Sequence, residues 1–478
     1  MTRPRSASFA DAWTGLSTRF LPFADAASDT LPLPRLLRLS MFQVSAGMAL
    51  ALLTGAINRV MIVELSVPAW LVALMISLPL VFAPFRALIG HKSDTHRSPL
   101  GWRRGPYIWF GSLTMFGGLA IMPFALILLT GQGVGPAWIG QAGAALAFLL
   151  VGAGLHTTQT AGLALATDVA PEDSRPRVVA LLYVMLLVGM GLSALIYSEL
   201  LRDYSHTKLI RVIQGSAVVA IALNVIALWK QEARSREVSH ATEPAVAFGA
   251  AWAGLMANVR AKRLLMAVAL GSAAFAMQDI LLEPYGAEIL GLTVSATTLL
   301  TALFALGSLI GFAAAARWLT RGANPFRLAA NGALVGILAF SGVIFADPLS
   351  SAHLFRAGTF LIGVGGGLFS VCMLSAAMEL AKSSDSGIAL GAWGAVQATA
   401  AGAALALGGI IRDAMELAAS TSIFGPAFTG KAIGYTTVYH IEIFLLFATL
   451  VVLGPLVQHT PEPDEDQKEA FGLAAFPS

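Results

Sequence analysis

Long apolar runs, separated by short polar connectors, repeat along almost the whole chain of 478 residues. Each run is long enough for an α-helix across the hydrocarbon core of a bilayer, which is roughly 30 Å thick and needs about 20 residues. The pattern therefore predicts an all-α polytopic membrane protein with twelve transmembrane helices. Their expected limits are 38–60, 68–90, 106–130, 136–167, 178–200, 209–230, 262–284, 294–316, 327–346, 352–381, 386–411 and 434–457.

Polar segments divide this series into two halves. The longest polar interruption, 231–261, falls between the sixth and seventh helices and is predicted to be a cytoplasmic linker. It separates an N-terminal six-helix bundle, 37–230, from a C-terminal six-helix bundle, 262–457. The flanking segments are an N-terminal stretch, 1–36, and an acidic tail, 458–478, whose charge favours disorder.

The N-terminal stretch contains a pattern of its own. Four apolar residues stand at i, i+4, i+7 and i+11, which is the spacing of one face of a short amphipathic helix. Such a helix is expected either to lie at the membrane interface or to dock on a partner subunit. The four residues are Phe9, Trp13, Leu16 and Phe20.

Composition and charge agree with a membrane location. Residues are 56% hydrophobic and only 12% charged, which excludes an ordinary soluble surface. In the twelve-helix arrangement, 22 of the 30 lysines and arginines fall on the side of the two termini and six on the opposite side. The positive-inside rule then predicts that both termini are cytoplasmic. Basic residues scattered among connectors do not form a nucleic-acid surface.

Internal repetition supports two related halves. Segment 150–168 aligns with segment 361–379 at a constant offset of 211, and both are the fourth helices of their halves. Parallel six-helix repeats around a central cavity characterise the major facilitator superfamily fold, which the chain is expected to adopt. Matched positions include Gly152 with Gly363 and Gly154 with Gly365.

The connector between the second and third helices is the most polar patch of the apolar region. It resembles the superfamily loop in which Gly-x-x-x-Asp is followed by basic residues. Such a loop is expected either to latch the two halves together or to be a solvated positive loop without a gating role. The residues of this pattern are Gly90, Asp94, Arg97, Arg103 and Arg104. Arg86, just before Gly90, is expected either to extend its side chain to the cytoplasmic face or to join the latch.

Longer blocks narrow the resemblance. The stretches NRVMIVELSVPAWLVALM, GLHTTQTAGLALATDVAPED, MQDILLEPYGAEILGL and LGAWGAVQATAAGAALALGG resemble the PucC/LhaA family, the bacteriochlorophyll delivery branch of the superfamily, and more closely its LhaA branch. The likeness covers most of residues 36–457. It implies a factor of the bacterial inner (intracytoplasmic) membrane that assists assembly of a light-harvesting 1 antenna. The implied partners are bacteriochlorophyll, antenna polypeptides, the reaction centre, pigment-synthesis enzymes and membrane lipids.

Pigment binding directs attention to His156, which we take as the only histidine well inside an apolar helix. The magnesium of bacteriochlorophyll accepts one axial ligand, and an imidazole can supply it. His156 shares a helical face with Gln159 and Thr160, and Gly152 and Gly154 are expected to leave room for a flat ring. The alternative is a structural hydrogen bond to a neighbouring helix. Asn58 completes the set of candidate pigment contacts.

Ionisable residues within predicted membrane helices are costly and therefore mark candidate functional positions. Arg59 and Glu64 close the first helix, while Asp279 and Glu283 lie near the same end of the seventh. Arg59 is expected to pair with an acid of the seventh helix across the two halves. Two alternatives stay open: the two acids share a proton on one helical face, or Pro284 breaks the helix and leaves them solvated.

Two functional classes follow from these features. The first is an antenna assembly factor that binds bacteriochlorophyll, with His156 as the candidate axial ligand of the pigment magnesium. The second is a proton-coupled small-solute transporter of the same fold that uses Asp279 and Glu283. Neither of these functions is enzymatic. The sequence contains no nucleophile–histidine–acid, metalloprotease or phosphate-binding loop pattern, so an enzyme is not expected.

Overall fold

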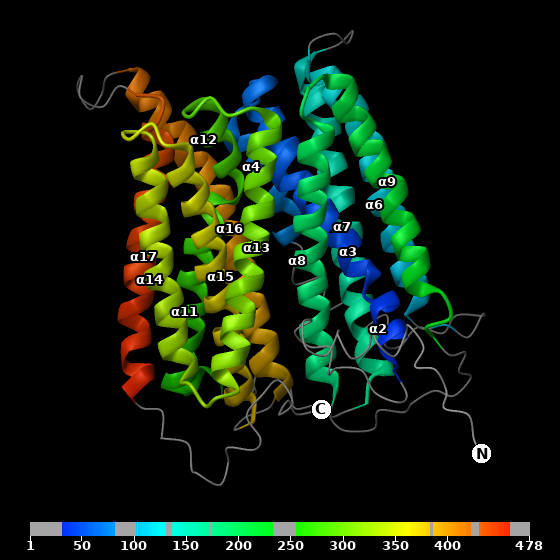
Figure 1. Ribbon diagram of the computed structural model, residues 1–478, viewed down its shortest axis with the longest axis vertical. Helices are drawn as coiled ribbons and strands as arrows, with labels where there is room; N and C mark the ends of the chain where they lie inside the picture. Colours follow the sequence, from blue (N-terminus) through cyan, green and yellow to red (C-terminus); the bar gives the residue numbers. More distant parts are fainter. Residues whose placement is uncertain are drawn as a thin grey trace, which may run out of the picture.

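The computed structural model of the chain describes residues 31–81, 102, 104–130, 136–171, 174–232, 255–382, 386–421 and 430–458. Within these ranges every regular element is helical, as predicted (Figure 1). Eleven helices are long and apolar enough to cross a membrane, and a shorter apolar helix stands in second position. The expected N-terminal amphipathic helix, the acidic tail and most of the linker lie outside the described residues.

The first bundle follows the predicted order of six helices. Its first span consists of α2 (Leu33–Leu39), α3 (Met41–Leu50) and the π-helical segments η2 (Ala51–Ile57) and η3 (Val60–Glu64). The five helices after it are α4 (Ala69–Val81), α6 (Gly105–Leu129), α7 (Ala137–Val169), α8 (Arg175–Leu200) and α9 (His206–Leu228).

The second bundle repeats this order, with an interruption in its first helix. The seventh span is α11 (Val259–Ala276), a 3-10 turn η5 (Met277–Ile280) and α12 (Leu282–Glu288). The remaining helices are α13 (Val294–Leu319), α14 (Pro325–Ala346), α15 (Ala352–Lys382), α16 (Ser386–Ser420) and α17 (Ile433–Gln458). The second bundle occupies the left side of Figure 1 and the first bundle the right side.

Polar residues in the connectors start several of these helices. The side chains of Ser205, Thr293 and Asn324 accept hydrogen bonds from backbone N–H groups in the first turns of α9, α13 and α14. These groups have no partner within the helix, so the caps stabilise each helix start.

Close glycine contacts hold corresponding helix pairs together in the two bundles. A Cβ at Gly154 of α7 would overlap the backbone of α6 at Gly111 and Met115. A Cβ at Gly365 of α15 would likewise approach the backbone of α14, at Gly332 and Gly336. The repeat seen in the sequence is therefore a repeat of backbone packing.

One helix limit differs in a way that matters for the site. The eleventh helix was predicted to end at residue 411, but α16 continues to Ser420. Arg412, assigned from the sequence to a connector, is therefore part of a helix. Its side chain is buried because the extra turns of α16 pack against α12 and the start of α17.

Candidate functional site

His156 lies on α7 and is half-buried. Its neighbours on the same face are engaged with protein groups: the Gln159 amide Nε2 donates to Gln43 Oε1 of α3 at 3.1 Å, and the Thr160 hydroxyl donates to the His156 carbonyl at 2.7 Å. Gln159 is only 8% exposed. Gln159 thus faces α3 of the first bundle, and the Thr160 hydroxyl is engaged with the backbone of its own helix.

The two glycines next to His156 do not provide the expected space. A Cβ at Gly152 would overlap the ring of Pro79 of α4, and Gly154 faces the backbone of α6. The prediction that they leave room for a flat ring is wrong, because helix packing already fills both positions. Gly367, which matches His156 in the second bundle, is packed in the same way against Ser308 of α13.

Asn58 joins the two bundles at the break in the seventh helix. Pro284 has no N–H group, so the Ile280 carbonyl four residues earlier has no donor within its own helix. The fully buried Asn58 amide donates to that carbonyl at 2.9 Å and to the Thr54 carbonyl at 3.0 Å. A proline of one bundle therefore creates the acceptor that an asparagine of the other bundle uses.

Arg59 forms its ion pair differently from the prediction. Its guanidinium pairs with Glu64 of its own span, at 2.5 Å between NH1 and Oε1, and donates to the Leu292 carbonyl of the second bundle at 3.4 Å. The expected pairing with an acid of the seventh helix is not formed. Partial burial, and then the neighbouring Glu64 carboxylate, raise the pKa of the Tyr204 phenol to about 12, against the lowering effect of Arg59.

The two acids of the seventh helix lie in different elements, Asp279 in the turn η5 and Glu283 in the first turn of α12, and no hydrogen bond joins them. Glu283 is 4% exposed and accepts from the Thr301 hydroxyl of α13 at 2.7 Å, while Asp279 accepts from the Gln278 amide. Burial excludes a solvated helix end for Glu283, whereas Asp279 is half-buried.

Glu442 of α17 is a buried acid that the sequence analysis did not select. Its exposure is 0%, and no basic side chain of the described residues forms an ion pair with it. Its carboxyl group lies close to the Gln278 backbone and to Asp279. The signal was present, since this glutamate stands inside the apolar run predicted for the twelfth helix, 434–457.

Arg412 is the centre of an ion-pair cluster at the end of the bundles that carries α12 (Figure 1). Its guanidinium lies 2.7 Å from Glu288, 2.7 Å from Asp413 and 2.6 Å from Glu416, with its side chain 8% exposed. Tyr435 accepts from Arg412 at 3.1 Å and donates to Glu288 at 2.8 Å. The cluster links α12, α16 and α17 within the second bundle.

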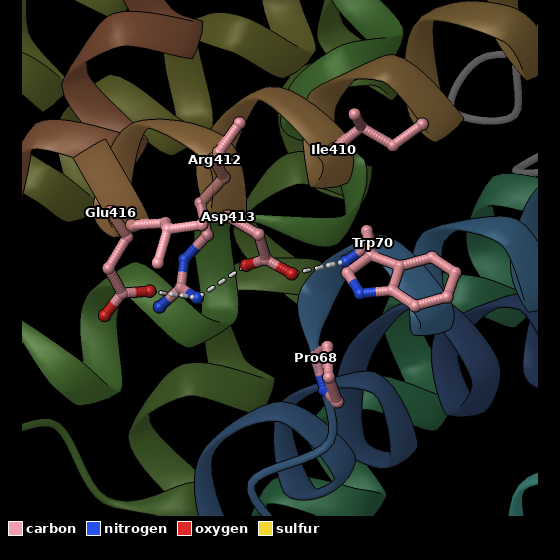
Figure 2. A pocket seen from close by; sticks show the side chains of 8 residues that line it. Pro68, Trp70, Ile410, Arg412, Asp413 and Glu416 are labelled. Atoms are coloured by element: carbon pink, nitrogen blue, oxygen red, sulfur yellow. Dashed lines mark hydrogen bonds and ion pairs between the residues drawn. The ribbon is translucent and has the colours of Figure 1, made fainter.

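Asp413 extends this cluster to the first bundle. Its second carboxylate oxygen accepts from the backbone N–H of Trp70 at 2.8 Å, and this N–H belongs to the first turn of α4. Figure 2 shows Asp413 between the Arg412 guanidinium and the Trp70 backbone, beside an open hollow lined also by Pro68 and Ile410. Near the same end, the Ser198 hydroxyl of α8 donates to the Ser295 carbonyl of α13 at 2.9 Å. Several contacts thus join the bundles here.

Of the residues predicted to form the latch, the structure describes only Arg104. Arg86, Gly90, Asp94, Arg97 and Arg103 lie outside the described residues. Arg104 is buried, and its Nε donates to Asp168 at 3.1 Å, while Glu232 accepts the backbone N–H groups of Arg104 and Gly105 at 2.8 and 2.7 Å. These contacts tie α6 to α7 and to the end of α9 within the first bundle.

Comparison with known families decides the family of this chain. The family described as PUCC protein matches residues 56–460. The chain belongs to the PucC family. A protein of the puhA-bchM intergenic region of Rhodobacter capsulatus, described as uncharacterized, is 55% identical, with 97% of this chain and 98% of that protein covered. Protein PucC of Rhodovulum sulfidophilum is 57% identical, with 84% and 89% covered.

A more distant relative and a solved structure extend the comparison. The bacteriochlorophyll synthase 44.5 kDa chain of Rhodobacter capsulatus is 28% identical to this PucC-family chain, with 84% of this chain and 93% of that protein covered. The crystal structure of the nucleoside transporter NupG (D323A mutant) superposes with a TM-score of 0.64 at 14% identity, covering 87% and 99%. The likeness to NupG shows the fold, which is that of a major facilitator transporter.

Proposed function

We propose that this PucC-family chain is an assembly factor for a light-harvesting 1 antenna in the bacterial inner membrane, with both termini cytoplasmic. In this role it binds bacteriochlorophyll and delivers it to antenna polypeptides around the reaction centre, or scaffolds those polypeptides. The observation that carries the proposal is membership of the PucC family over nearly the whole chain. The bacteriochlorophyll-related name of the 28% identical relative supports the pigment.

The fold suits this task physically. Bacteriochlorophyll and single-helix polypeptides both reside in the bilayer, so a carrier for them must present apolar surface to lipid. Every spanning helix except the first exposes large apolar side chains, such as Leu192 of α8 and Phe444 of α17. When bound, the pigment supplies a magnesium ion that needs one axial ligand from the chain.

A test uses cells that make the pigment. Purification in mild detergent is expected to yield bacteriochlorophyll absorption together with antenna polypeptides, and deletion of the chain should reduce the antenna at unchanged reaction-centre levels. A preparation from pigmented cells that carries neither pigment nor antenna polypeptide would exclude this function.

The second candidate is a proton-coupled transporter of small solutes. It is favoured by one observation, the burial of Glu283 and Glu442 in the second bundle, near the helix break and without a full set of hydrogen-bond partners. It predicts solute uptake into liposomes driven by a pH gradient, abolished when Asp279 and Glu283 are both replaced by their amides. Uptake that survives the double replacement would exclude these two acids as the proton carriers.

A further inference from the structure

His440 is a second histidine inside an apolar helix, and it faces outward. It is the eighth residue of the span Ile433–Val457, so it lies about 10 Å from the helix start at 1.5 Å per residue. Its side chain is exposed, unlike the half-buried His156. The expectation that His156 is the only histidine of this kind is therefore wrong. An ionisable group on a lipid-facing helix surface is costly and needs an explanation.

The hydrogen bond of His440 fixes which ring nitrogen is available. Nδ1 lies 2.7 Å from the Thr436 carbonyl oxygen, one turn earlier in α17. A carbonyl oxygen can only accept, so Nδ1 carries the proton and donates it. With Nδ1 held by the carbonyl, Nε2 is the ring nitrogen that a metal can bind. Histidines that bind metals have this arrangement, with one nitrogen held by a carbonyl and the other directed at the metal.

The surface beside His440 is apolar and partly aromatic. Going down α17, the next exposed positions on the same face are Phe444, Phe447 and Val451, at 69%, 53% and 75% exposure. The neighbouring helix α14 adds Leu338 and Phe345 near the same level, since the Phe340 and Tyr439 rings lie 6.3 Å apart. The imidazole thus stands at one end of an apolar track that runs along the membrane normal.

We infer that His440 Nε2 is an axial ligand for the magnesium of a tetrapyrrole bound on the lipid-facing surface of α17, with its hydrocarbon tail along Phe444 and Phe447. The inference rests on the proposed pigment function and names its site. The fit follows from the donor: a magnesium tetrapyrrole takes four ring nitrogens and one axial ligand, and a single neutral imidazole in an apolar surface supplies that ligand. A lipid-facing site also lets a partner helix reach the pigment laterally.

The experiment distinguishes loss of this ligand from misfolding of the protein and from loss of other polar groups on its surface. Full-length protein, produced in a host without bacteriochlorophyll and placed in nanodiscs, is titrated with bacteriochlorophyll a. Binding is followed by absorption, and axial ligation by resonance Raman bands that report magnesium coordination. His440→Leu is expected to weaken binding at least tenfold and to remove the imidazole-ligated signature. His440→Gly should regain that signature when free imidazole is added.

Two control variants match the change. Gln214→Leu removes an exposed polar group at similar depth in α9, the corresponding helix of the first bundle, and should bind pigment like the wild type. His156→Leu tests the other candidate ligand, and loss of the imidazole-ligated signature in that variant instead of His440→Leu would overturn the assignment to His440. All variants should keep the melting temperature of the wild type. Unchanged affinity and ligation in His440→Leu would overturn this site while leaving the proposed function intact. A wild-type protein that binds no pigment would overturn pigment binding altogether.

Discussion

The two bundles use the same packing but bury different chemistry. Gly154 and Gly365 bring the third and fourth helices of each bundle into backbone contact, 211 positions apart. In the first bundle, the buried polar side chains near the middle of the helices are neutral, and several form pairs, such as Gln43 with Gln159 and Ser45 with Asn224. Among its described acids, none is buried. The second bundle buries Glu283 and Glu442 completely or nearly so.

The two bundles therefore differ in how their stability depends on protonation, although their helices pack in the same way. Neutral amide pairs hold helices together at any pH, whereas buried carboxyl groups couple packing to protonation. The break in the seventh helix is also confined to the second bundle, and it supplies the Ile280 carbonyl that receives Asn58. The first bundle thus contributes fixed donors to the interface, and the second contributes the groups whose state can change.

The strongest test of the asymmetry compares two arginines near the ends of the fifth helices. Arg412→Met leaves three carboxylates and Tyr435 without their partner, so we expect a loss of about 3–5 kcal/mol in unfolding free energy. Arg202 of the first bundle is 73% exposed and lies 3.6 Å from Glu199, so Arg202→Met should cost less than about 1 kcal/mol. Thermal unfolding in detergent measures both, and equal losses would contradict the asymmetry.

The shared packing is tested by alanine at the two matched glycines. A Cβ at Gly365 would lie 2.7 Å from the Gly332 carbonyl oxygen, and a Cβ at Gly154 would lie 2.5 Å from that of Gly111. Gly154→Ala and Gly365→Ala should each lower stability by about 1–3 kcal/mol.

Gly117 of α6 and Gly391 of α16 face open space, so alanine there should not destabilise and can stabilise through helix propensity. If only one of the two variants, Gly154→Ala or Gly365→Ala, lowered the melting temperature of the protein, the two glycines would not contribute equally to stability.

These glycines also illustrate what the sequence can predict. Apolar periodicity and helix length predicted the helix order, and the matching of Gly154 with Gly365 predicted a structural repeat, because both depend on local pattern. The backbone carbonyls of the second bundle that Arg59 and Asn58 contact depend on where another helix turns. The donor-free carbonyl of Ile280 follows from Pro284, but its partner Asn58 lies 222 positions away in sequence. Arg412 was missed because the end of α16 is stabilised by tertiary packing.

The interface between bundles is tested at Asp413. Asp413→Ala removes the acceptor of the Trp70 N–H. We expect the conformation in which the two bundles touch at this end to become less stable by about 1 kcal/mol. Spin labels at Arg202 and Leu349, both exposed near this end, should then show a larger long-distance population by pulsed electron resonance.

Glu416→Gln is the matched control, since it removes a carboxylate from Arg412 without touching the first bundle. If this variant shifts the distances as much as Asp413→Ala does, charge balance rather than the Trp70 contact holds the bundles together.

Among these variants, the smallest effect on stability is expected for replacement of Glu442. A small effect there would indicate that the carboxyl group is uncharged. A fully buried carboxyl group that has no basic partner among the described residues is favoured in its uncharged form, so Glu442→Gln should change the unfolding free energy by less than about 1 kcal/mol. Dicyclohexylcarbodiimide, which reacts with protonated carboxyl groups in apolar surroundings, should label the wild-type protein at Glu442 by mass spectrometry. The exposed Glu199 of the first bundle, which lies in water and not in apolar surroundings, should stay unlabelled. An ionised Glu442 would give the opposite results, with no label at this position and a protein made more stable by glutamine, and the two bundles would then not differ in proton binding.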